Sequence, residues 1–383
     1  MTPHPYSFDP LPRPAVGPGE FAVAAVGLDH GHIHGMVQGL VEAGAELAWV
    51  HDSDPDRAAA LAARYPGTRV AAREEEILED PSVRLVASAA IASERAPIGL
   101  RALAAGKHAF VDKAPMTTFA QLEAVREATA RTGLLYAVYY GERVHSEAAI
   151  LAGQLVERGA IGRVLQVVCF GPHRVGGRRP DWFYDPAQYG GILCDIGSHN
   201  FEQMLHYTGA RGGRIASATI ANHAHPDTPG LQDFGDAHVV LDNGTTGYVR
   251  VDWFTPEGLD VFGDGRTLIL GTDGYLEIRK YVDITTENGG GQVLLVDHEG
   301  QHRFDARGMT GFPYFGRLIR DCLDGTQTAM TQEHALAAAE LSLAAQAQAV
   351  DLVAAVPAAD APGATAPGAA QAGAEVPREV GAP

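Results

Sequence analysis

The strongest constraint on the fold is a change of periodicity near residue 140. From Phe21 to about Tyr140, short apolar runs alternate with helical patterns, which is the order that βαβ units of a parallel sheet produce. The predicted strands and helices are, in turn, Phe21–Val26, His32–Ala43, Glu46–His51, Pro55–Tyr65, Leu85–Ala90, Ala96–Ala105, His108–Val111, Phe119–Thr132 and Leu135–Val138. We therefore expect residues 20–140 to form an α/β domain around a parallel sheet.

The rest of the chain has a different pattern. After a helical stretch at Ser146–Arg158, apolar and polar residues alternate over longer runs such as "RVLQVVCF" and "GRTLILGTDGYLEIRKY", as in half-buried strands. The triplets Asp-Asn-Gly at 242–244 and Thr-Asp-Gly at 272–274 join neighbouring runs as hairpin turns do. A last helix is predicted from Glu333 to about Val353. Residues 141–355 are therefore expected to form an α+β domain on a mainly antiparallel open sheet.

The two ends of the chain differ from both domains. Residues 1–19 contain six prolines and predict an extended arm. Residues 356–383 consist mostly of Ala, Gly and Pro, so they have little to bury against the entropy cost of ordering a backbone. We expect this C-terminal segment to be a disordered tail.

Composition narrows the possible partners and the compartment. The 383 residues are 46% hydrophobic and 20% charged, as in globular proteins, and a net charge of −18 repels nucleic acid and anionic membranes. The chain has no apolar run of the roughly 20 residues that cross a bilayer, and no secretory leader pattern. The three cysteines (Cys169, Cys194 and Cys322) are far apart and odd in number, so we expect buried thiols. A cytoplasmic protein is expected.

The stretch "VAAVGLDHGHIHG" at residues 23–35 favours a nucleotide-binding turn. A strand, then Gly27, then a helix is the geometry that directs backbone N–H groups at a pyrophosphate. Asp52, 25 positions later, would accept hydrogen bonds from a ribose diol and repel a 2′-phosphate, which favours NAD over NADP. Asp29 and His32 replace the second and third glycines of the usual fingerprint. With His30, these residues are the candidate cofactor-binding residues.

The same turn also permits a metal interpretation. A His-x-His after a first strand is how zinc amidohydrolases begin, and further ligands of such a site would be Lys113, His199, His223 and Asp227. That fold needs eight βα units around a barrel, whereas about five strands here stand in βα context. We therefore predict no metal ligands and keep a zinc-dependent hydrolase as the alternative enzyme.

Five segments resemble one known family. The segment "GLRALAAGKHAFVDKAPMTT" resembles the "aGkhv…EKP" region of the Gfo/Idh/MocA oxidoreductases. The similarity continues, in the same order, through "RGAIGRV", "GGILCDIGSH", "GTDGYLEIR" and "EHALAAAELSLAA". Together the segments span about residues 21–353.

The resemblance implies a fold, a reaction and site residues. Members combine a Rossmann domain that binds NAD(P) with a sheet domain that forms the substrate pocket and the oligomer contacts, and they oxidise or reduce sugars, inositols and related polyols. On the matching positions, Lys113 would be the catalytic lysine, also close to the cofactor, and Asp195 and His199 the catalytic pair. The usual proline after this lysine is Ala114, with Pro115 one position late. A homo-oligomer, either dimer or tetramer, is expected, and a non-catalytic dinucleotide-binding protein stays an alternative.

The Asp-x-x-x-His pair also has a geometric interpretation. If residues 192–207 are helical, Asp195, His199, Glu202 and His206 share one stripe that lines a cleft. The opposite stripe would face the core and consists of Leu193, Gly197, Phe201 and Met204. His199 is the candidate base, because an unperturbed imidazole pKa of about 6.5 suits proton exchange near neutrality. Asp195 would orient it or bind a second hydroxyl, and Lys113 would polarise the substrate oxygen.

Two further segments carry weaker candidates. In the loop "GPHRVGGRRPDWF", Trp182 would stack on a sugar face while Arg178 or Arg179 binds a substrate oxygen, although a plain solvated loop fits equally well. Glu142 and Arg143 follow the last strand of the first domain, near the place of the nicotinamide in the family. In the alternative interpretation, Glu142 and Arg143 form an ordinary ion pair on the surface.

Overall fold

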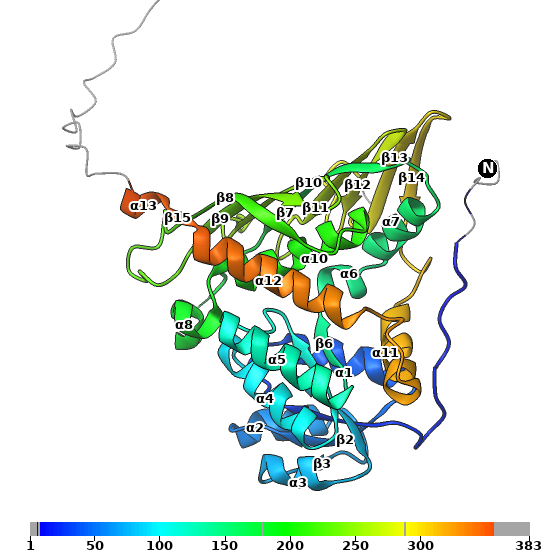
Figure 1. Ribbon diagram of the computed structural model, residues 1–383, viewed down its shortest axis with the longest axis vertical. Helices are drawn as coiled ribbons and strands as arrows, with labels where there is room; N and C mark the ends of the chain where they lie inside the picture. Colours follow the sequence, from blue (N-terminus) through cyan, green and yellow to red (C-terminus); the bar gives the residue numbers. More distant parts are fainter. Residues whose placement is uncertain (1–5, 7, 178, 287–288, 356–383) are drawn as a thin grey trace, which may run out of the picture.

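A computed structural model describes residues 6, 8–177, 179–286 and 289–355. It contains two sheets, one of six parallel strands and one of nine strands that are mostly antiparallel (Figure 1). The predicted fold class is therefore confirmed. The sheet of the first domain is open, so the barrel that a zinc amidohydrolase requires is absent from the described residues.

The N-terminal sheet has the strand order β3-β2-β1-β4-β5-β6, with the switch of direction beside β1. Its strands are β1 Ala22–Val26, β2 Glu46–His51, β3 Arg69–Val70, β4 Val83–Ser88, β5 His108–Asp112 and β6 Tyr136–Tyr139. The helices between them are α1 His32–Glu42, α2 Pro55–Ala62, α3 Glu74–Glu79, α4 Ala92–Ala104 and α5 Phe119–Thr132. Both faces of the sheet are covered: alternate residues of β1 belong to two different hydrophobic cores, Val23 and Ala25 to one, Ala24 and Val26 to the other.

Three details of this domain differ from the sequence prediction. The pair β3 and α3 was missed, because a two-residue exposed strand and a six-residue acidic helix carry almost no periodic signal. The strand predicted at Leu85–Ala90 lies two residues earlier, at Val83–Ser88. Helix α4 begins at Ala92, four residues before its predicted start, and contains Pro97.

The C-terminal sheet has the order β14-β13-β12-β11-β7-β10-β9-β8-β15. Its strands are β7 Val164–Pro172, β8 Gly213–Ala221, β9 Phe234–Leu241, β10 Thr246–Asp252, β11 Arg266–Gly271, β12 Gly274–Arg279, β13 Gln292–Asp297, β14 Gln301–Asp305 and β15 Val350–Asp351. The two predicted hairpin turns join β9 to β10 and β11 to β12 as antiparallel pairs. The pairs β7·β10 and β8·β15 are parallel.

Helices cover the face of this sheet that is turned toward the N-terminal domain (Figure 1). In chain order these and the remaining helices are α6 Gly141–Val144, α7 Glu147–Glu157, the 3-10 helix Asp181–Tyr184, α8 Pro186–Tyr189, α9 Ile192–Asp195, α10 Gly197–Thr208, α11 Pro313–Asp324, α12 Gln332–Gln348 and α13 Leu352–Ala355. The last helix was predicted to extend to about Val353, but it ends at Gln348. Val350 and Asp351 instead form strand β15, which pairs with β8. No helix of the described residues has the length and apolar character needed to span a membrane.

Two segments tie the domains together. Helix α11 returns to the N-terminal domain, where the ring of Phe315 fills the space that a side chain at Gly39 would occupy. The Pro-rich arm, as far as it is described, runs along both domains (Figure 1): Asp9 pairs with Arg158 at 2.7 Å, and the N–H of Ala15 donates to the carbonyl of Ala43. The predicted tail at 356–383 lies outside the described residues.

Candidate active site

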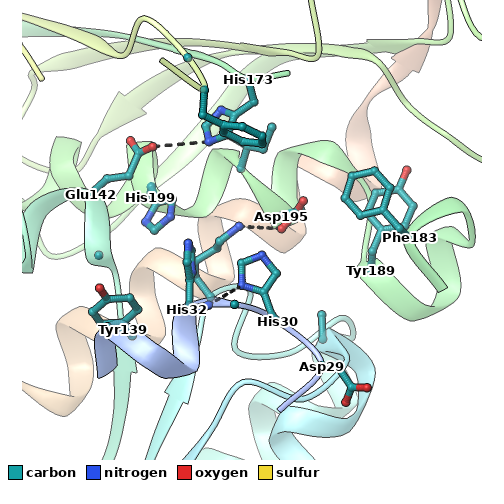
Figure 2. Close-up of a pocket in the computed structure, with 18 of the residues that line it drawn as sticks. Asp29, His30, His32, Tyr139, Glu142, His173, Phe183, Tyr189, Asp195 and His199 are labelled. Atoms are coloured by element: carbon teal, nitrogen blue, oxygen red, sulfur yellow. Dashed lines mark hydrogen bonds and ion pairs between the residues drawn. The ribbon is translucent and has the colours of Figure 1, made fainter. Parts of the chain in front are cut away.

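A cavity of about 740 Å³ lies at the carboxyl ends of β1, β5 and β6 (Figure 2). Ligands bind at this edge of open parallel sheets, because the connecting loops and helix N-termini meet there. The walls come from both domains: the turn after β1, the residues after β5 and β6, helices α9 and α10, and the loops that follow β7 and β10. Its volume falls in the range of small-molecule sites, roughly 300–1,000 Å³.

Lys113 and Asp195 form an ion pair in this cavity. Lys113 is the first residue past β5, and its Nζ donates to Oδ1 of Asp195 at 2.7 Å (Figure 2). Burial raises the pKa of Asp195, but the charge and the hydrogen bond of Lys113 outweigh it and leave the pKa below its usual value. The Lys113–Ala114 peptide bond is cis. The pair thus joins the Rossmann sheet to the helical layer of the second domain.

His199 lines the same cavity from α10, as predicted. It is 3% exposed, and its Nδ1 has no hydrogen-bond partner among the described residues. Burial lowers the pKa of His199 well below 6.5, Glu142 opposes this shift, and Lys113 and Lys280 reinforce it. The near-neutral pKa assumed for His199 from the sequence is therefore wrong. The imidazole is neutral at pH 7, and the neutral form is the one that accepts a proton.

Glu142 is a buried part of the cavity wall, so its interpretation as a surface ion pair is wrong. Its carboxylate lies 2.7 Å from Nζ of Lys280 and 3.8 Å from Nε2 of His173. Burial raises the pKa of Glu142, but Lys280, His199 and His173 together lower it by a larger amount. The pKa of Glu142 is therefore below its usual value. An anion therefore stands close to the neutral His199.

The turn after β1 has the strand–glycine–helix geometry that the sequence predicts. Gly27 has φ +71°, and a Cβ there would lie 2.7 Å from the Cβ of Ala90. Only glycine combines that conformation with so close an approach. Helix α1 begins five residues later, and Asp29, His30 and His32 all line the cavity.

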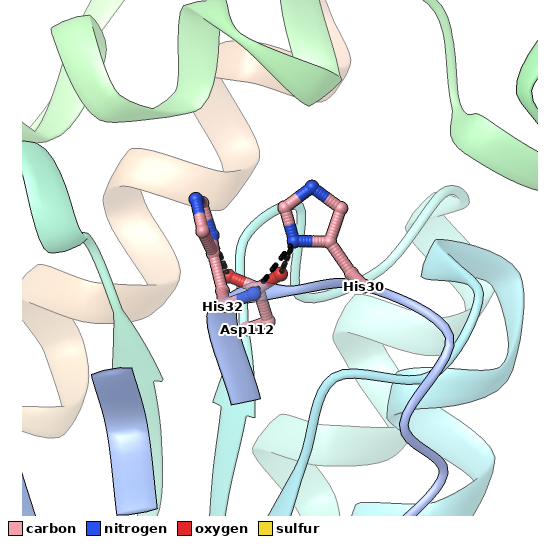
Figure 3. A group of neighbouring side chains, drawn as sticks. All are labelled: His30, His32 and Asp112. Atoms are coloured by element: carbon pink, nitrogen blue, oxygen red, sulfur yellow. Dashed lines mark hydrogen bonds and ion pairs between the residues drawn. The ribbon is translucent and has the colours of Figure 1, made fainter. Parts of the chain in front are cut away.

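His30 and His32 converge on Asp112, the last residue of β5 (Figure 3). Nδ1 of His32 lies 2.9 Å from Oδ1 of Asp112, and Nδ1 of His30 lies 3.2 Å from Oδ2. Asp112 is fully buried, and Arg95 lies 3.2 Å from Oδ2 on the other side. Burial raises the pKa of Asp112, but His32, Arg95 and His30 hold it well below its usual value.

Asp52 does not line this cavity. Its carboxylate accepts hydrogen bonds from the N–H groups of Leu28 and Asp54, at 2.6 and 2.7 Å, and from Arg57 at 2.8 Å. The guanidinium of Arg57 also lies 3.0 Å from Asp29. Asp52 therefore fixes the turn and orients Arg57, while Asp29 is the carboxylate that reaches the cavity.

The predicted polar stripe divides into two halves. Asp195 and His199 line the cavity, whereas Glu202 and His206 do not. Glu202 is fully buried and binds Arg143 and His334 through Oε1. The expectation that all four side chains face a cleft is therefore wrong for the second pair, because helices α6, α7 and α12 pack over that part of α10. The opposite stripe is buried as predicted.

The loop between β7 and α8 contributes Trp182 and Arg179 to the cavity wall. The guanidinium of Arg179 lies 5.0 Å from the ring centroid of Phe183, and its Nε donates to the carbonyl of Val175. Arg178 lies outside the described residues. Of the additional ligands considered for zinc, His223 and Asp227 lie exposed on the loop after β8, away from the cavity wall.

The polar residues in and around this site that were missed in the sequence include Arg95, Asp112, His173 and Lys280. Asp112 precedes the predicted lysine directly, and a carboxylate at the end of a fully buried strand is a signal that could have found it. Arg95 follows β4 and donates to the carbonyls of Ala90 and Ala114. His173 and Lys280 stand after strands of the second sheet, where no local pattern separates them from loop residues.

Two family models match the chain. The first describes an oxidoreductase family with an NAD-binding Rossmann fold and matches residues 21–140. The second describes the GFO/IDH/MocA C-terminal domain and matches residues 150–277. The chain belongs to the GFO/IDH/MocA oxidoreductase family. As a member of that family it is an NAD(P)-dependent oxidoreductase with the Rossmann domain that the sequence predicts.

Individual relatives of this GFO/IDH/MocA chain are consistent with that result. The structure of a candidate oxidoreductase from Erwinia carotovora atroseptica SCRI1043 is 49% identical, covers 87% of this chain and 100% of that one, and has a TM-score of 0.85. The scyllo-inositol 2-dehydrogenase (NAD(+)) of Bacillus subtilis is 24% identical over 288 residues, 73% of this chain and 80% of that protein.

A third likeness concerns the fold alone. The structure of levoglucosan dehydrogenase in complex with NADH and levoglucosan is 16% identical, covers 86% of this chain and 97% of that one, and has a TM-score of 0.73. The levoglucosan dehydrogenase structure thus shares its fold with most of this chain.

Alignments with several other curated relatives span only about half or less of those proteins.

Proposed function

We propose that this protein is an NAD-dependent dehydrogenase that moves a hydride between the nicotinamide cofactor and a secondary alcohol of a sugar, an inositol or a related polyol. The observation that carries the proposal is the pairing of Lys113 with Asp195 beside the neutral His199, in a cavity at the carboxyl edge of the Rossmann sheet. The substrate class follows the names of the relatives, a scyllo-inositol dehydrogenase and a levoglucosan dehydrogenase.

The turn after β1 fits a dinucleotide. A Cβ at Gly31 would meet no atom within 4 Å, so space is open beside the start of α1, where backbone N–H groups attract phosphate. NAD is favoured over NADP because the single guanidinium of Arg57 is shared by Asp29, Asp52 and Asp54. This cluster carries an excess of negative charge that disfavours a 2′-phosphate.

Each of four side chains has a separate role in alcohol oxidation. The bound nicotinamide ring supplies the hydride acceptor. His199 takes the hydroxyl proton on an imidazole nitrogen while the hydride leaves the carbon that bears that oxygen. The amine of Lys113 donates a hydrogen bond to the same oxygen and stabilises its developing negative charge. Asp195 holds this amine in place and accepts a hydrogen bond from a neighbouring hydroxyl, and Trp182 stacks on the ring of the polyol.

We also propose that the protein is a homo-oligomer built on the C-terminal sheet. The helices cover one face of that sheet (Figure 1). On its other face, three large apolar side chains of β11 and β12 are exposed, Leu268, Leu270 and Tyr275. Contiguous exposed apolar surface of this kind marks interfaces. Sedimentation of the purified chain would measure its state, and a monomer at every concentration would contradict this part.

The experiment is a comparison of NAD and NADP by calorimetry, followed by a panel of inositols and pyranoses with the cofactor that binds. The proposal expects tighter binding of NAD and the absorbance of NADH with at least one polyol. Binding of NAD without NADH formation across the panel would indicate a non-catalytic dinucleotide-binding protein. Turnover that needs no NAD would indicate a hydrolase.

A further inference from the structure

The proposed function assigns the turn after β1 to dinucleotide binding but gives the imidazoles of His30 and His32 no chemical role, yet both are arranged around one carboxylate. His30, His32 and Asp112 each offer one ligand atom, and these atoms lie within 4.8 Å of one another (Figure 3). Two imidazoles and a carboxylate are a donor set that first-row divalent metal ions bind. The histidines follow β1 and the carboxylate ends β5, on the other side of β4 at the same edge of the sheet, so the fold, not the local sequence, brings them together.

The hydrogen bonding around His30 directs one ring nitrogen toward the carboxylate. The backbone N–H of His32 donates to Nδ1 of His30 at 3.3 Å, as in the tautomer in which this nitrogen carries a lone pair that can ligate a metal ion. The same nitrogen lies 3.2 Å from Oδ2 of Asp112. That oxygen is buried and also lies 3.2 Å from the guanidinium of Arg95. In this tautomer, the nitrogen and the carboxylate both offer lone pairs to one ion.

The neutral imidazole is the form of histidine that ligates metal ions. Asp112 is the complementary anion, and Arg95 lies 3.2 Å behind it and keeps its carboxylate oriented toward the turn.

The spacing agrees with metal ligation. With bonds of about 2.1 Å to nitrogen and oxygen, neighbouring ligand atoms lie about 3.0–3.4 Å apart in octahedral or tetrahedral geometry. Nδ1 of His32 lies 2.9 Å from Oδ1 of Asp112 and Nδ1 of His30 lies 3.2 Å from Oδ2, and both separations are close to that range. Three protein ligands leave at least one position free, and His30 and His32 line the cavity.

We propose that His30, His32 and Asp112 form a binding site for a single first-row divalent transition-metal ion, of the class of Zn²⁺ or Co²⁺, whose open position faces the cavity. The ion would lie beside the start of α1, where water or an oxygen atom of a bound molecule completes its coordination. This site is separate from the Lys113–Asp195 pair and does not depend on hydride transfer.

The test uses the full-length, untagged protein after treatment with a chelator. Co²⁺ is added in the absence of nucleotide, the visible absorption of the bound ion reports nitrogen ligation, and calorimetry with Zn²⁺ gives the stoichiometry and affinity. We expect one ion per chain. His30→Ala and His32→Ala should each weaken binding by at least about a hundredfold, since each removes a direct ligand.

His34→Ala is the matched control, because this third histidine of the turn contacts Arg64 and lies outside the group. Its affinity should equal that of the unaltered chain. Circular dichroism checks that each variant is folded, and Asp112→Asn adds a third ligand test where it folds. Absence of stoichiometric binding, retention of affinity in both His30→Ala and His32→Ala, or an equal loss in His34→Ala would overturn the proposal. Calorimetry with NAD alone separates this result from the proposed dehydrogenase function.

Discussion

One polar stripe runs from the last residue of α9 along α10, and its two ends differ in what covers them. The cavity end consists of Asp195 and His199, and the end that we call sealed consists of the buried Glu202 and the half-buried His206, neither of which lines the cavity. Each end has one acid and one histidine, and each acid is paired with a cation. Asp195 pairs with Lys113 in the cavity, whereas Glu202 pairs with Arg143 under a helical layer. Similar chemistry on one helix face therefore supports a reaction at one end and an interior ion pair at the other.

The difference shows that position on a helix does not decide function. Spacing of four and seven residues places side chains on one face, but the elements packed against that face decide whether a ligand can reach them. At the sealed end, α7 approaches so closely that a Cβ at Gly153 would lie 2.8 Å from Nε2 of His206. We therefore expect substitutions at the cavity end to change turnover and substitutions at the sealed end to change stability.

The largest effect is expected at the cavity end. Lys113→Met removes the hydrogen-bond donor to the substrate oxygen and should lower kcat/KM by at least about a hundredfold, the worth of a positioned acid–base or electrostatic group. Steady-state NADH formation with the best polyol of the panel measures it. Turnover within threefold of the unaltered enzyme would contradict the assigned role.

The sealed end should show the largest loss of stability. Glu202→Gln removes a fully buried charge that Arg143 and His334 share, and breaking such a pair costs about 3–5 kcal/mol. Urea unfolding measures the change. The matched control is Glu340→Gln, which removes the exposed partner of Arg126 and should cost less than about 1 kcal/mol. Equal losses in the two variants would contradict the distinction between buried and exposed pairs.

Acid should also act on the sealed end. Burial, followed by the charge of Arg143, lowers the pKa of His206 to about 3, whereas the unfolded chain titrates near 6.5. The unfolded state therefore binds the extra proton, and stability is full above about pH 6.5 and falls as the pH drops toward 3. His206→Gln should reduce this slope by at most about 1.4 kcal/mol per pH unit. Unfolding curves between pH 4 and 7 in both proteins measure it, and equal slopes would contradict the expectation.

A smaller effect is expected at the turn after β1. Asp29→Asn removes one of three carboxylates around Arg57, so binding of NADP should improve about three- to tenfold while NAD changes little. Calorimetry with both nucleotides measures this selectivity. The control is Asp56→Asn on exposed α2, outside the Arg57 pairs. A gain of NADP affinity that is the same in both variants would indicate a general charge effect.

Much of the fold could be predicted from the sequence. The alternation of strands and helices before residue 140 predicted the Rossmann sheet, since its long helices and apolar strands carry strong periodic signals. The Asp-Asn-Gly and Thr-Asp-Gly turns predicted two hairpins of the second sheet. Lys113, Asp195 and His199 were found through the family resemblance and share one cavity.

The remaining features depend on contacts between distant parts of the chain. Asp52 occupies the predicted acidic position, but its carboxylate oxygens accept hydrogen bonds from Arg57 and from two backbone N–H groups. Glu202 fits the polar stripe, and only the packing of α6 and α12 shows that it is enclosed. The meeting of His30 and Asp112, 82 residues apart, follows from the shared sheet edge at which β1 and β5 end on either side of β4, which no local pattern encodes.

The most direct test compares two matched substitutions on the same stripe, His199→Gln and His206→Gln, with kcat/KM and the free energy of unfolding measured for each. The account predicts that His199→Gln lowers kcat/KM by at least about a hundredfold, whereas His206→Gln leaves kcat/KM within threefold and alters the pH dependence of unfolding. Equal loss of kcat/KM in both variants, or a loss in His206→Gln alone, would contradict it.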